Sequence, residues 1–435
     1  MSNPVPSAAI SAALAARRRP PEAVLDHLRR GSEAVVGLAN GEPKTVLDAI
    51  EAAADHLTDV RLHQMLPLRA RPYMRGAYPG LRHVSWFLGS ANREAFQQGQ
   101  CELVPADFSE VPHLMRRATR IGLVLAAAAP PDRHGYFSLG VCADYSAALI
   151  GHMPFFLEVN HRMPRTFGEN QVHISQVLGW CEADYPLVEL PPPLPTPADQ
   201  RIAALVAARI DDGATLQIGF GSIPGQVLSL LGDHRELGVH TELFGDGLAD
   251  LVERGAITGT RKRTHRCKMI ATNVIGTQRL FDFVDANPGL ELWPVDYTND
   301  PRVIAREDHF VSVNASMEVD FLGQCASESL GSHYYSSSGG QADFARGAMY
   351  AEHGRSFITL HATADNDRVS RIVAQLRPGA AVTTFKNAVD CVVTEYGVAE
   401  LRGSSIRQRT ERLIAIAHPK FRDELTQQGR ALGYL

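Results

Sequence analysis

A carboxylate that follows a glycine-rich turn is the feature of this sequence best suited to chemistry. The turn Gly219–Gly225 reads GFGSIPG and lies between an apolar segment and a helix-like run, and Glu242 follows it. Glycines at such a turn let backbone amides approach a ligand, and a helix N-terminus favours phosphate or a developing oxyanion. Two chemistries fit this pattern. Glu242 either holds the ribose of a dinucleotide or acts as a nucleophile that attacks an acyl group.

The elements around this carboxylate are those of an open α/β sheet. We predict a strand over Ala214–Ile218, a helix over Gln226–Leu231, and a strand over Val239–Thr241 that ends at Glu242. Ligands of such a sheet bind beyond the C-terminal ends of its strands, where the turn and the carboxylate lie. The dinucleotide fingerprint is degraded, because the spacing is Gly-x-Gly-x-x-x-Gly. Pro224 stands where helix backbone forms, although proline is tolerated in a first helical turn.

A second glycine-rich segment helps to separate the two interpretations. Residues Tyr334–Phe344 read YYSSSGGQADF, which is too polar for a core strand. A simple dinucleotide fold has no need of such a segment. An acyl-transfer site does need it, because a carbonyl that becomes tetrahedral requires amide donors. Taken alone, the segment is also compatible with an exposed surface loop.

Composition limits the class of protein. The chain has 435 residues, 45% of them apolar and 21% charged, which predicts a soluble globular protein of two domains. The net charge of -5 gives no indication of a nucleic-acid or membrane partner. Six scattered cysteines without a CxxC pair argue against a zinc site or a disulfide framework and fit a reducing cytosol. We see no signal peptide and no apolar run of membrane-spanning length, and expect a cytoplasmic protein.

Strand-like and helix-like segments alternate along the chain, which predicts α/β domains with mostly parallel sheets. In the first half the predicted strands are Ala34–Leu38, Val60–Met65, Val84–Leu88, Gly122–Ala127 and Phe155–Val159. In the second half they also include Ala256–Thr258, Lys268–Ala271, Gly289–Pro294, Phe310–Ala315, Phe357–Leu360, Val382–Thr384 and Val389–Thr394. A proline-rich run, Leu190–Pro197, is typical of a semi-rigid spacer. We therefore predict an N-terminal domain over residues 1–190, a linker over 191–199, and a C-terminal domain over 200–435 that carries Glu242.

Several long motifs in a fixed order carry a family resemblance. In the second half they are HTELFGDG, SSSGGQADFARGA, VVTEYGVAELRG and IAHPKFRDEL, and in the first half ELVPADFSEVPHL, PPDRHGYFSLG and EVNHRMPRTFG. Together they resemble the acetyl-CoA hydrolases and class I CoA-transferases, and most nearly the branch of 4-hydroxybutyrate and butyryl-CoA:acetate CoA-transferases. The resemblance spans about Gly31 to Leu425.

The resemblance implies two Rossmann-like α/β domains with the active site at their junction. It implies that Glu242 is the nucleophile and that a glutamyl-CoA thioester forms on it. The amides that hold the thioester oxyanion would belong to Gly221, Ser222 and Gly340. The residues that would bind CoA are Gln217, Ile218, Gly219, Phe220, Gly221, Met317, Gly339 and Gly340.

The resemblance also implies a reaction. CoA would move by a ping-pong mechanism between an acyl-CoA and a short acid of the 4-hydroxybutyrate, butyrate, succinate, itaconate or acetate type. No metal and no permanently bound cofactor is implied, because coenzyme A is itself the substrate, and a homodimer or larger homo-oligomer is expected. An acyl-CoA hydrolase on the same scaffold, an NAD(P)-dependent oxidoreductase and a non-catalytic CoA-binding module remain alternatives.

Two further groups of residues have less specific interpretations. Four first-half residues are candidates for an acyl pocket, and they are His134, Asn160, Met163 and Arg165. Arg165 is included because a carboxylate substrate needs a cationic or amide partner. The basic segment Arg261–Lys268 could meet CoA phosphates, but a solvated charged face is its simpler interpretation.

Overall fold

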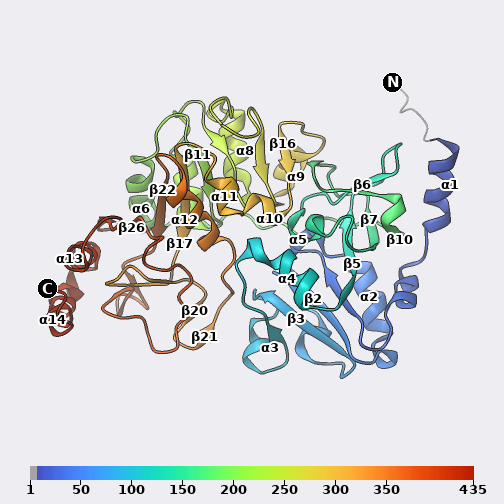
Figure 1. Ribbon diagram of the computed structural model, residues 1–435, viewed down its shortest axis with the longest axis horizontal. Coiled ribbons are helices and arrows are strands. Elements are labelled where there is room, and N and C mark those ends of the chain that lie inside the picture. The colour runs from blue at the N-terminus through green and yellow to red at the C-terminus, as the bar shows by residue number, and fades with distance from the viewer. Residues whose placement is uncertain (1–6) are drawn as a thin grey trace. The chain divides into compact units, whose positions relative to one another are not determined.

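The computed structural model describes residues 7–435, which form two compact units (Figure 1). Unit 1 comprises Met1–Leu190 and Ile270–Thr298, and unit 2 comprises Pro191–Met269 and Asn299–Leu435. Residues 1–6 of the predicted N-terminal domain lie outside the described residues. The units differ from the predicted domains in two segments, because residues 270–298 pack with unit 1 and the predicted linker, residues 191–199, belongs to unit 2.

Backbone pairing explains why this segment belongs to unit 1. Strand β16 (Leu290–Leu292) pairs in parallel with β8 (Phe167–Gly168), and the Leu190 N–H donates to the Gly276 carbonyl at 2.9 Å. These partners are distant in sequence. A proline-rich run marks a local change in the chain but carries no information about such pairings.

Unit 1 is built on a seven-stranded parallel sheet in the order β10-β7-β5-β1-β2-β3-β4. Its strands are β1 (Glu33–Val36), β2 (Val60–Met65), β3 (Leu81–Phe87), β4 (Glu102–Leu103), β5 (Ile121–Ala128), β7 (Phe155–Asn160) and β10 (Val177–Ala183). The five strands predicted in the first half are confirmed. Every residue of β7 is buried, as expected for a strand covered on both faces. Strands β6 (Tyr136–Ser138) and β9 (Gln171–His173) form a separate antiparallel pair.

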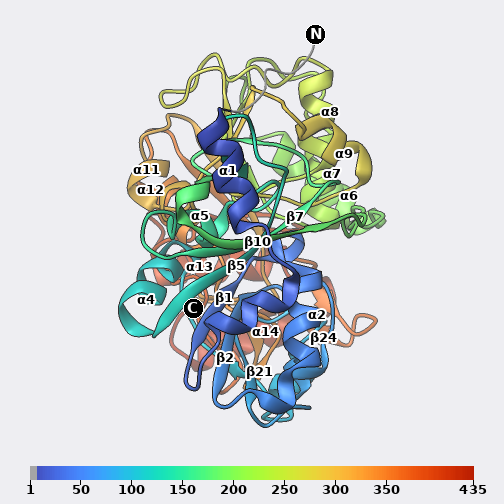
Figure 2. The same ribbon diagram turned by 90° about the vertical axis from the view of Figure 1, so that its right-hand side faces the viewer.

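The helices of unit 1 are α1 (Ala8–Arg17), α2 (Lys44–Ala52), α3 (Arg93–Gln97), α4 (Val111–Ala118), α5 (Asp144–Ala148), α9 (Gln278–Val284) and α10 (Val295–Thr298). Helix α2 buries Val46, Leu47 and Ile50, which join the core beneath the central strands. Helix α1 lies against β10 (Figure 2), where the Trp180 indole N–H donates to the Leu14 carbonyl at 3.0 Å.

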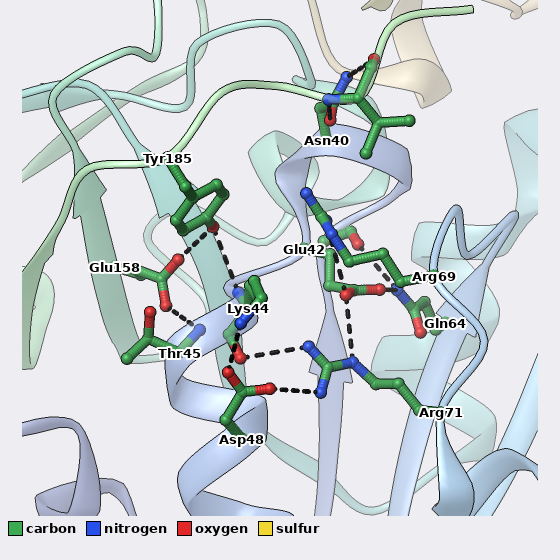
Figure 3. Close-up of polar contacts among 12 residues, drawn as sticks. Asn40, Glu42, Lys44, Thr45, Asp48, Gln64, Arg69, Arg71, Glu158 and Tyr185 are labelled. Atoms are coloured by element: carbon green, nitrogen blue, oxygen red, sulfur yellow. Dashed lines mark hydrogen bonds and ion pairs between the residues drawn. The ribbon is translucent and has the colours of Figure 1, made fainter.

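A buried ionic network holds the segments that follow β1 and β2 (Figure 3). The Arg71 guanidinium donates to Glu42 at 3.1 Å, to Asp48 at 2.9 Å and to Glu51 at 3.1 Å. Arg71 is 5% exposed and Glu42 is fully buried, so each charge requires its partner. Gln64, on β2, also donates to Glu42, at 3.0 Å.

Unit 2 contains a six-stranded sheet in the order β12-β11-β17-β22-β26-β27. Its strands are β11 (Thr215–Ile218), β12 (Gly238–Val239), β17 (Phe310–Ala315), β22 (Arg355–Thr359), β26 (Cys391–Thr394) and β27 (Gly397–Glu400). All pairs are parallel except β26 with β27. The strands predicted over Ala256–Thr258 and Val382–Thr384 are wrong, because each segment contributes only an isolated bridge, to Leu237 and to Cys325 respectively.

Shorter strands of the second half lie outside this sheet. They are β13 (Leu243–Phe244), β14 (Met269–Ala271), β15 (Asn273–Val274), β18 (Glu318–Asp320), β19 (Cys325–Ala326), β20 (Ser329–Leu330), β21 (His333–Tyr334), β23 (Thr363–Ala364), β24 (Val369–Ser370) and β25 (Ile372–Val373). Strand β18 pairs with β19 and β25 in a small sheet, and its Glu318 and Asp320 are buried.

The helices of unit 2 are α6 (Pro197–Ala207), α7 (Ser222–Ser229), α8 (Asp246–Glu253), α11 (Pro301–Ile304), α12 (Gln341–Tyr350), α13 (Ile406–Ile416) and α14 (Arg422–Ala431). Helix α12 packs against β17 and β22, whereas α6 and α13 pack against β26 (Figure 1). Helix α6 begins inside the predicted linker, because Thr196 and Asp199 form a capping box around Pro197. Within residues 7–435, no helix combines the length and apolar character that crossing a membrane requires.

Candidate active site

Glu242 lies three residues beyond β12, at the C-terminal end of the unit 2 sheet. The Lys262 ammonium supports this end of the strand, since it donates to the Val239 carbonyl at 2.8 Å and to the Lys268 carbonyl at 3.0 Å. Lys262 is only 4% exposed. The prediction that Arg261–Lys268 forms a solvated charged face is therefore wrong for this residue, which stabilises the approach to Glu242.

The Glu242 carboxylate is held by one side-chain amide. The Asn299 Nδ2 group donates to Glu242 Oε2 at 2.7 Å. No side chain among the described residues donates a hydrogen bond to the other oxygen, Oε1. Burial raises the pKa of Glu242 to about 7, although the Asn299 hydrogen bond acts to lower it. The carboxylate is thus oriented through one oxygen, and both of its protonation states are populated near neutral pH.

The second glycine-rich segment meets this carboxylate. Gly340 precedes α12 with ordinary backbone angles, φ -98° and ψ 3°, so its conformation does not require glycine. Close approach does require it, because a Cβ atom at Gly340 would overlap both Glu242 Oε2 and Asn299 Nδ2. Gly339 has a positive φ of 58°, which favours glycine for conformational reasons. The structure thereby brings together Glu242 and Gly340, two of the residues predicted to act in the site.

The first glycine-rich turn, predicted over Gly219–Gly225, ends at Gly221, because α7 begins at Ser222 and not at the predicted Gln226. Gly221 has φ 140° and ψ 178°, a region open essentially to glycine alone. Neither Gly221 before α7 nor Gly340 before α12 supplies a side-chain cap to its helix. The residues at these two N-cap positions therefore give no side-chain hydrogen bond to the amides of the first turns, and a helix N-terminus favours an anion or a polarised oxygen. This arrangement is compatible with the predicted oxyanion donors, which remain a prediction.

The other residues predicted to bind CoA differ in their surroundings. Gln217 and Asn314 exchange two side-chain hydrogen bonds, at 3.0 and 3.2 Å, and Ser312 donates to Gln217 at 2.7 Å. The Gln217 amide is thus committed to linking β11 with β17, and no contact of its side chain supports CoA binding. Phe220 is 50% exposed. Ile218 is buried and Gly219 and Met317 are half-buried, so for these residues CoA contact stays a prediction.

The four candidates for an acyl pocket lie in unit 1 and do not form one cluster. Met163 and Arg165 line a cavity of about 630 Å³. The Arg165 guanidinium is already bonded to Asp132 at 3.0 Å, Gln171 at 3.2 Å and two backbone carbonyls. Asn160 is buried with its amide on the backbone of Tyr185, and His134 is exposed. Through these contacts, Arg165 and Asn160 stabilise the surrounding loops of unit 1. Their participation in an acyl pocket stays a prediction.

Asn299 is the site residue that the sequence did not reveal. It stands in the tripeptide Asn299-Asp300-Pro301, a pattern typical of a turn that begins a helix. Asp300 does cap α11, by accepting from the Arg302 N–H at 2.8 Å. Nothing in the local sequence indicates that the preceding asparagine reaches Glu242, 57 positions earlier.

Models of one protein family match most of the chain. The acetyl-CoA hydrolase/transferase N-terminal domain matches residues 17–189. The acetyl-CoA hydrolase/transferase C-terminal domain matches residues 276–429. The second match includes Asn299 and Gly340.

Full-length comparisons agree with this match. The chain is 43% identical to the succinyl-CoA:cyclohexane-1-carboxylate CoA transferase of Geobacter metallireducens, over 90% of each chain. It is 39% identical to the 4-hydroxybutyrate coenzyme A transferase of Clostridium kluyveri, over 94% of this chain and 96% of that protein. The crystal structure of RipA from Yersinia pestis superposes with a TM-score of 0.93 at 34% identity, over 98% of this chain and all of that one. The chain belongs to the acetyl-CoA hydrolase/transferase family.

Proposed function

We propose that this protein is an acyl-CoA:carboxylate CoA-transferase that uses Glu242 as a covalent nucleophile. The observation that carries the proposal is the Glu242 carboxylate held by Asn299 and set directly against Gly340. The full-length relatives named above are CoA transferases, which supports the same class of reaction. The interpretation of Glu242 as a ribose ligand is not retained, because the family acts on CoA thioesters.

The proposed chemistry requires only carboxylates, thiolate and thioester. Glu242 Oε1 attacks the thioester carbonyl of an acyl-CoA, and the C–S bond breaks to give an acyl-glutamyl anhydride and CoA thiolate. The thiolate then attacks the glutamyl carbonyl, which releases the first acid and leaves a glutamyl-CoA thioester. A second acid repeats these steps in reverse and leaves as the new acyl-CoA.

Each residue of the site has a task in this sequence. Asn299 holds Oε2, and the other oxygen, Oε1, is the proposed attacking atom. The absence of a side chain at Gly340 lets the Glu242 carboxylate and the Asn299 amide lie directly against the start of α12. Amides at the N-termini of α7 and α12 are the proposed donors to the oxygen that becomes negative. The anhydride is high in energy, so binding of the remote part of CoA must offset its formation.

The mass of the intact protein tests this proposal. Incubation with succinyl-CoA or acetyl-CoA, without an acceptor acid, should add the mass of CoA less water, and peptide mapping should place it on Glu242. The Glu242→Gln variant, which keeps the shape but not the nucleophile, should show no adduct. Full activity of that variant would overturn the proposal.

A hydrolase is the second candidate, because the family description covers both activities. Free thiol released from acyl-CoA without any acceptor acid would favour it, whereas release that depends on the acceptor identifies a transferase. A screen of 4-hydroxybutyrate, butyrate, succinate, itaconate and acetate as acceptors would define the preferred acid. We also propose that the protein forms a homodimer or larger homo-oligomer in the cytoplasm. Light scattering, which measures the molar mass in solution, tests the oligomeric state.

A further inference from the structure

Two histidines and an aspartate converge at the edge of the unit 2 sheet opposite to Glu242. Asp308 and His309 directly precede β17, and His353 lies two residues before β22. These two strands pair in parallel, so their N-terminal ends meet at one edge. Ligands of the reaction in such a sheet bind at the C-terminal ends. The cluster is therefore separate from the proposed chemistry, and the inference does not rest on the proposed function.

The three side chains direct their donor atoms at one point. The Nδ1 atoms of His309 and His353 each lie 3.0 Å from the same oxygen of Asp308, Oδ1. The two imidazole rings are stacked, with centroids 4.6 Å apart and planes 27° from parallel. One ligand atom from each residue lies within 4.8 Å of the other two.

A surrounding ion pair fixes the aspartate. The Arg263 guanidinium donates to the other oxygen of Asp308, Oδ2, at 3.1 Å, and to Glu352 at 2.9 Å. The backbone N–H of His309 donates to the Glu352 carbonyl at 2.9 Å. Asp308 is thereby oriented through Oδ2, while Oδ1 accepts from the His309 backbone N–H at 2.8 Å and lies 3.0 Å from each imidazole Nδ1. Hydrogen bonds of this kind are what orient a ligating carboxylate in metal sites.

Both histidines occupy unusual backbone positions. His309 has a φ of 49° and His353 a φ of 55°, in the left-handed region that residues other than glycine rarely adopt. Their side chains are 45% and 61% exposed, so an ion can reach them from solvent. The fold thus holds two histidines in costly conformations, side by side and open to water.

We propose that Asp308, His309 and His353 bind a divalent transition-metal ion of the zinc class. Two imidazoles and one carboxylate are a donor set that suits Zn²⁺, Ni²⁺ and Cu²⁺ better than Mg²⁺ or Ca²⁺. Imidazole nitrogens that each lie 3.0 Å from the Asp308 oxygen fit ligands that are each about 2.0–2.2 Å from one ion, with water completing the coordination. The ion would join the starts of β17 and β22, and its role would be structural.

Protons must compete with the metal. In the present arrangement the imidazoles can donate their Nδ1 hydrogens to Asp308, and metal binding requires those nitrogens to be unprotonated. We therefore expect the affinity for the metal to fall as the pH is lowered, because ligand protonation opposes metal binding.

Calorimetric titration of the full chain with ZnCl₂, after removal of metals by a chelator, tests the proposal. We expect saturable binding of one ion per chain. The affinity for Zn²⁺ should be at least tenfold lower in His353→Gln and in His309→Gln. His152→Gln is the matched control, because His152 is exposed and lies outside the cluster. Co²⁺ substitution should produce visible absorption bands in the native protein that both cluster variants lack. Binding that persists unchanged in His353→Gln, or no saturable binding at all, would overturn the assignment.

Thermal unfolding supplies a second readout that is independent of catalysis. Zn²⁺ at saturating concentration should raise the Tm of the native protein and of His152→Gln, but not that of His353→Gln. His353 is the exposed member of the cluster, so its replacement should leave the metal-free Tm nearly unchanged. An equal rise in Tm for all three proteins would show that Zn²⁺ acts elsewhere.

Discussion

Glu242 meets two demands that oppose each other at the scale of a single residue. A nucleophilic carboxylate must be ionised, yet a water-excluding site favours its neutral form. Burial raises the pKa of Glu242 to about 7, and the Asn299 amide acts in the opposite direction. A carboxylate of this basicity is a stronger nucleophile than an exposed one, and it is still ionised in a useful fraction at neutral pH.

The raised pKa predicts a stability cost that grows with pH. Between pH 4.5 and about 7 the folded protein binds a proton at Glu242 that the unfolded chain has lost, so stability falls as the pH rises. The shift corresponds to at most about 3 kcal/mol above pH 7. We expect Glu242→Gln to unfold at nearly the native Tm at pH 4.5 and at a higher Tm at pH 8. A difference in Tm that does not change with pH would contradict this account.

Asn299 predicts a matching effect on the pH dependence of acylation. Replacing it with alanine removes the hydrogen bond to the ionised form, so the pKa of Glu242 should rise further. A hydrogen bond to a charged group is worth about 1.5–3 kcal/mol, so kcat/KM should fall about 10- to 100-fold at pH 7. The pH profile of adduct formation should shift to higher pH in Asn299→Ala. A loss of rate without that shift would assign Asn299 a purely structural role.

Two glycine-rich segments serve the site at the scale of the secondary-structure elements, for different physical reasons. Gly221 is required by its own backbone angles at the entry to α7. Glycine is required at position 340, before α12, because the side chains of Glu242 and Asn299 occupy the space that a Cβ atom would need. The same residue type in two similar loops thus meets a conformational constraint in one and a steric constraint in the other.

Gly340→Ala tests the steric constraint. Its backbone angles accept alanine, so the helix should form, but the added methyl group must displace Glu242 or Asn299. A displacement of about 1 Å in a reacting group can reduce the rate about 10²-fold, and we expect a loss of at least that size with little change in Tm. Gly122→Ala is the control, because the nearest neighbour of an added Cβ there is 4.0 Å away. Full activity in Gly340→Ala would remove this residue from the site.

The ionic network of unit 1 should carry a large part of that unit's stability (Figure 3). Arg71→Met leaves Glu42 buried without its closest cation, which lies at 3.1 Å, while Arg69 lies at 3.7 Å. Breaking a buried pair in this way costs about 3–5 kcal/mol. Urea denaturation should show this loss. The double variant Glu42→Gln/Arg71→Met should recover part of it, and equal stability of the two variants would show that pairing contributes little.

The chain crosses between its two compact units more than once at the scale of the whole molecule. Unit 1 takes residues 270–298 from the second half of the sequence. These residues supply buried side chains, among them Leu280, Phe281, Leu290 and Leu292. A division of the chain at residue 190 would remove that part of the core from unit 1.

This organisation predicts the behaviour of fragments. A fragment of residues 1–190 should be poorly folded, with exposed apolar surface that binds hydrophobic dyes and is cleaved rapidly by proteases. Fusion of residues 270–298 to its C-terminus through a short flexible linker should restore protection, because Leu190 lies beside Gly276, with their backbones bonded at 2.9 Å. Equal protection of both fragments would show that the 270–298 segment is not part of the folding unit.

Local pattern was sufficient for most of the fold and for part of the site. The strands β2 and β17 were predicted at their observed residues because the alternation of apolar and polar side chains within each strand is a local pattern. The strands predicted over Ala256–Thr258 and Val382–Thr384 failed because similar composition occurs in loops that bond to a single neighbour. Lys262 was predicted to be solvated, since no local signal showed the carbonyls that its buried ammonium would reach.

The sequence by itself determined the α/β class, the family and the identity of Glu242 and the two glycine-rich segments, because these are properties of local order and motif. Only the tertiary structure decided that Asn299 holds the carboxylate, that Gly340 is glycine for lack of space, and that residues 270–298 complete unit 1. The physical reason is the same in each case. Each of these features depends on contacts between residues that are far apart along the chain. The local sequence around a residue does not indicate which distant residue will contact it.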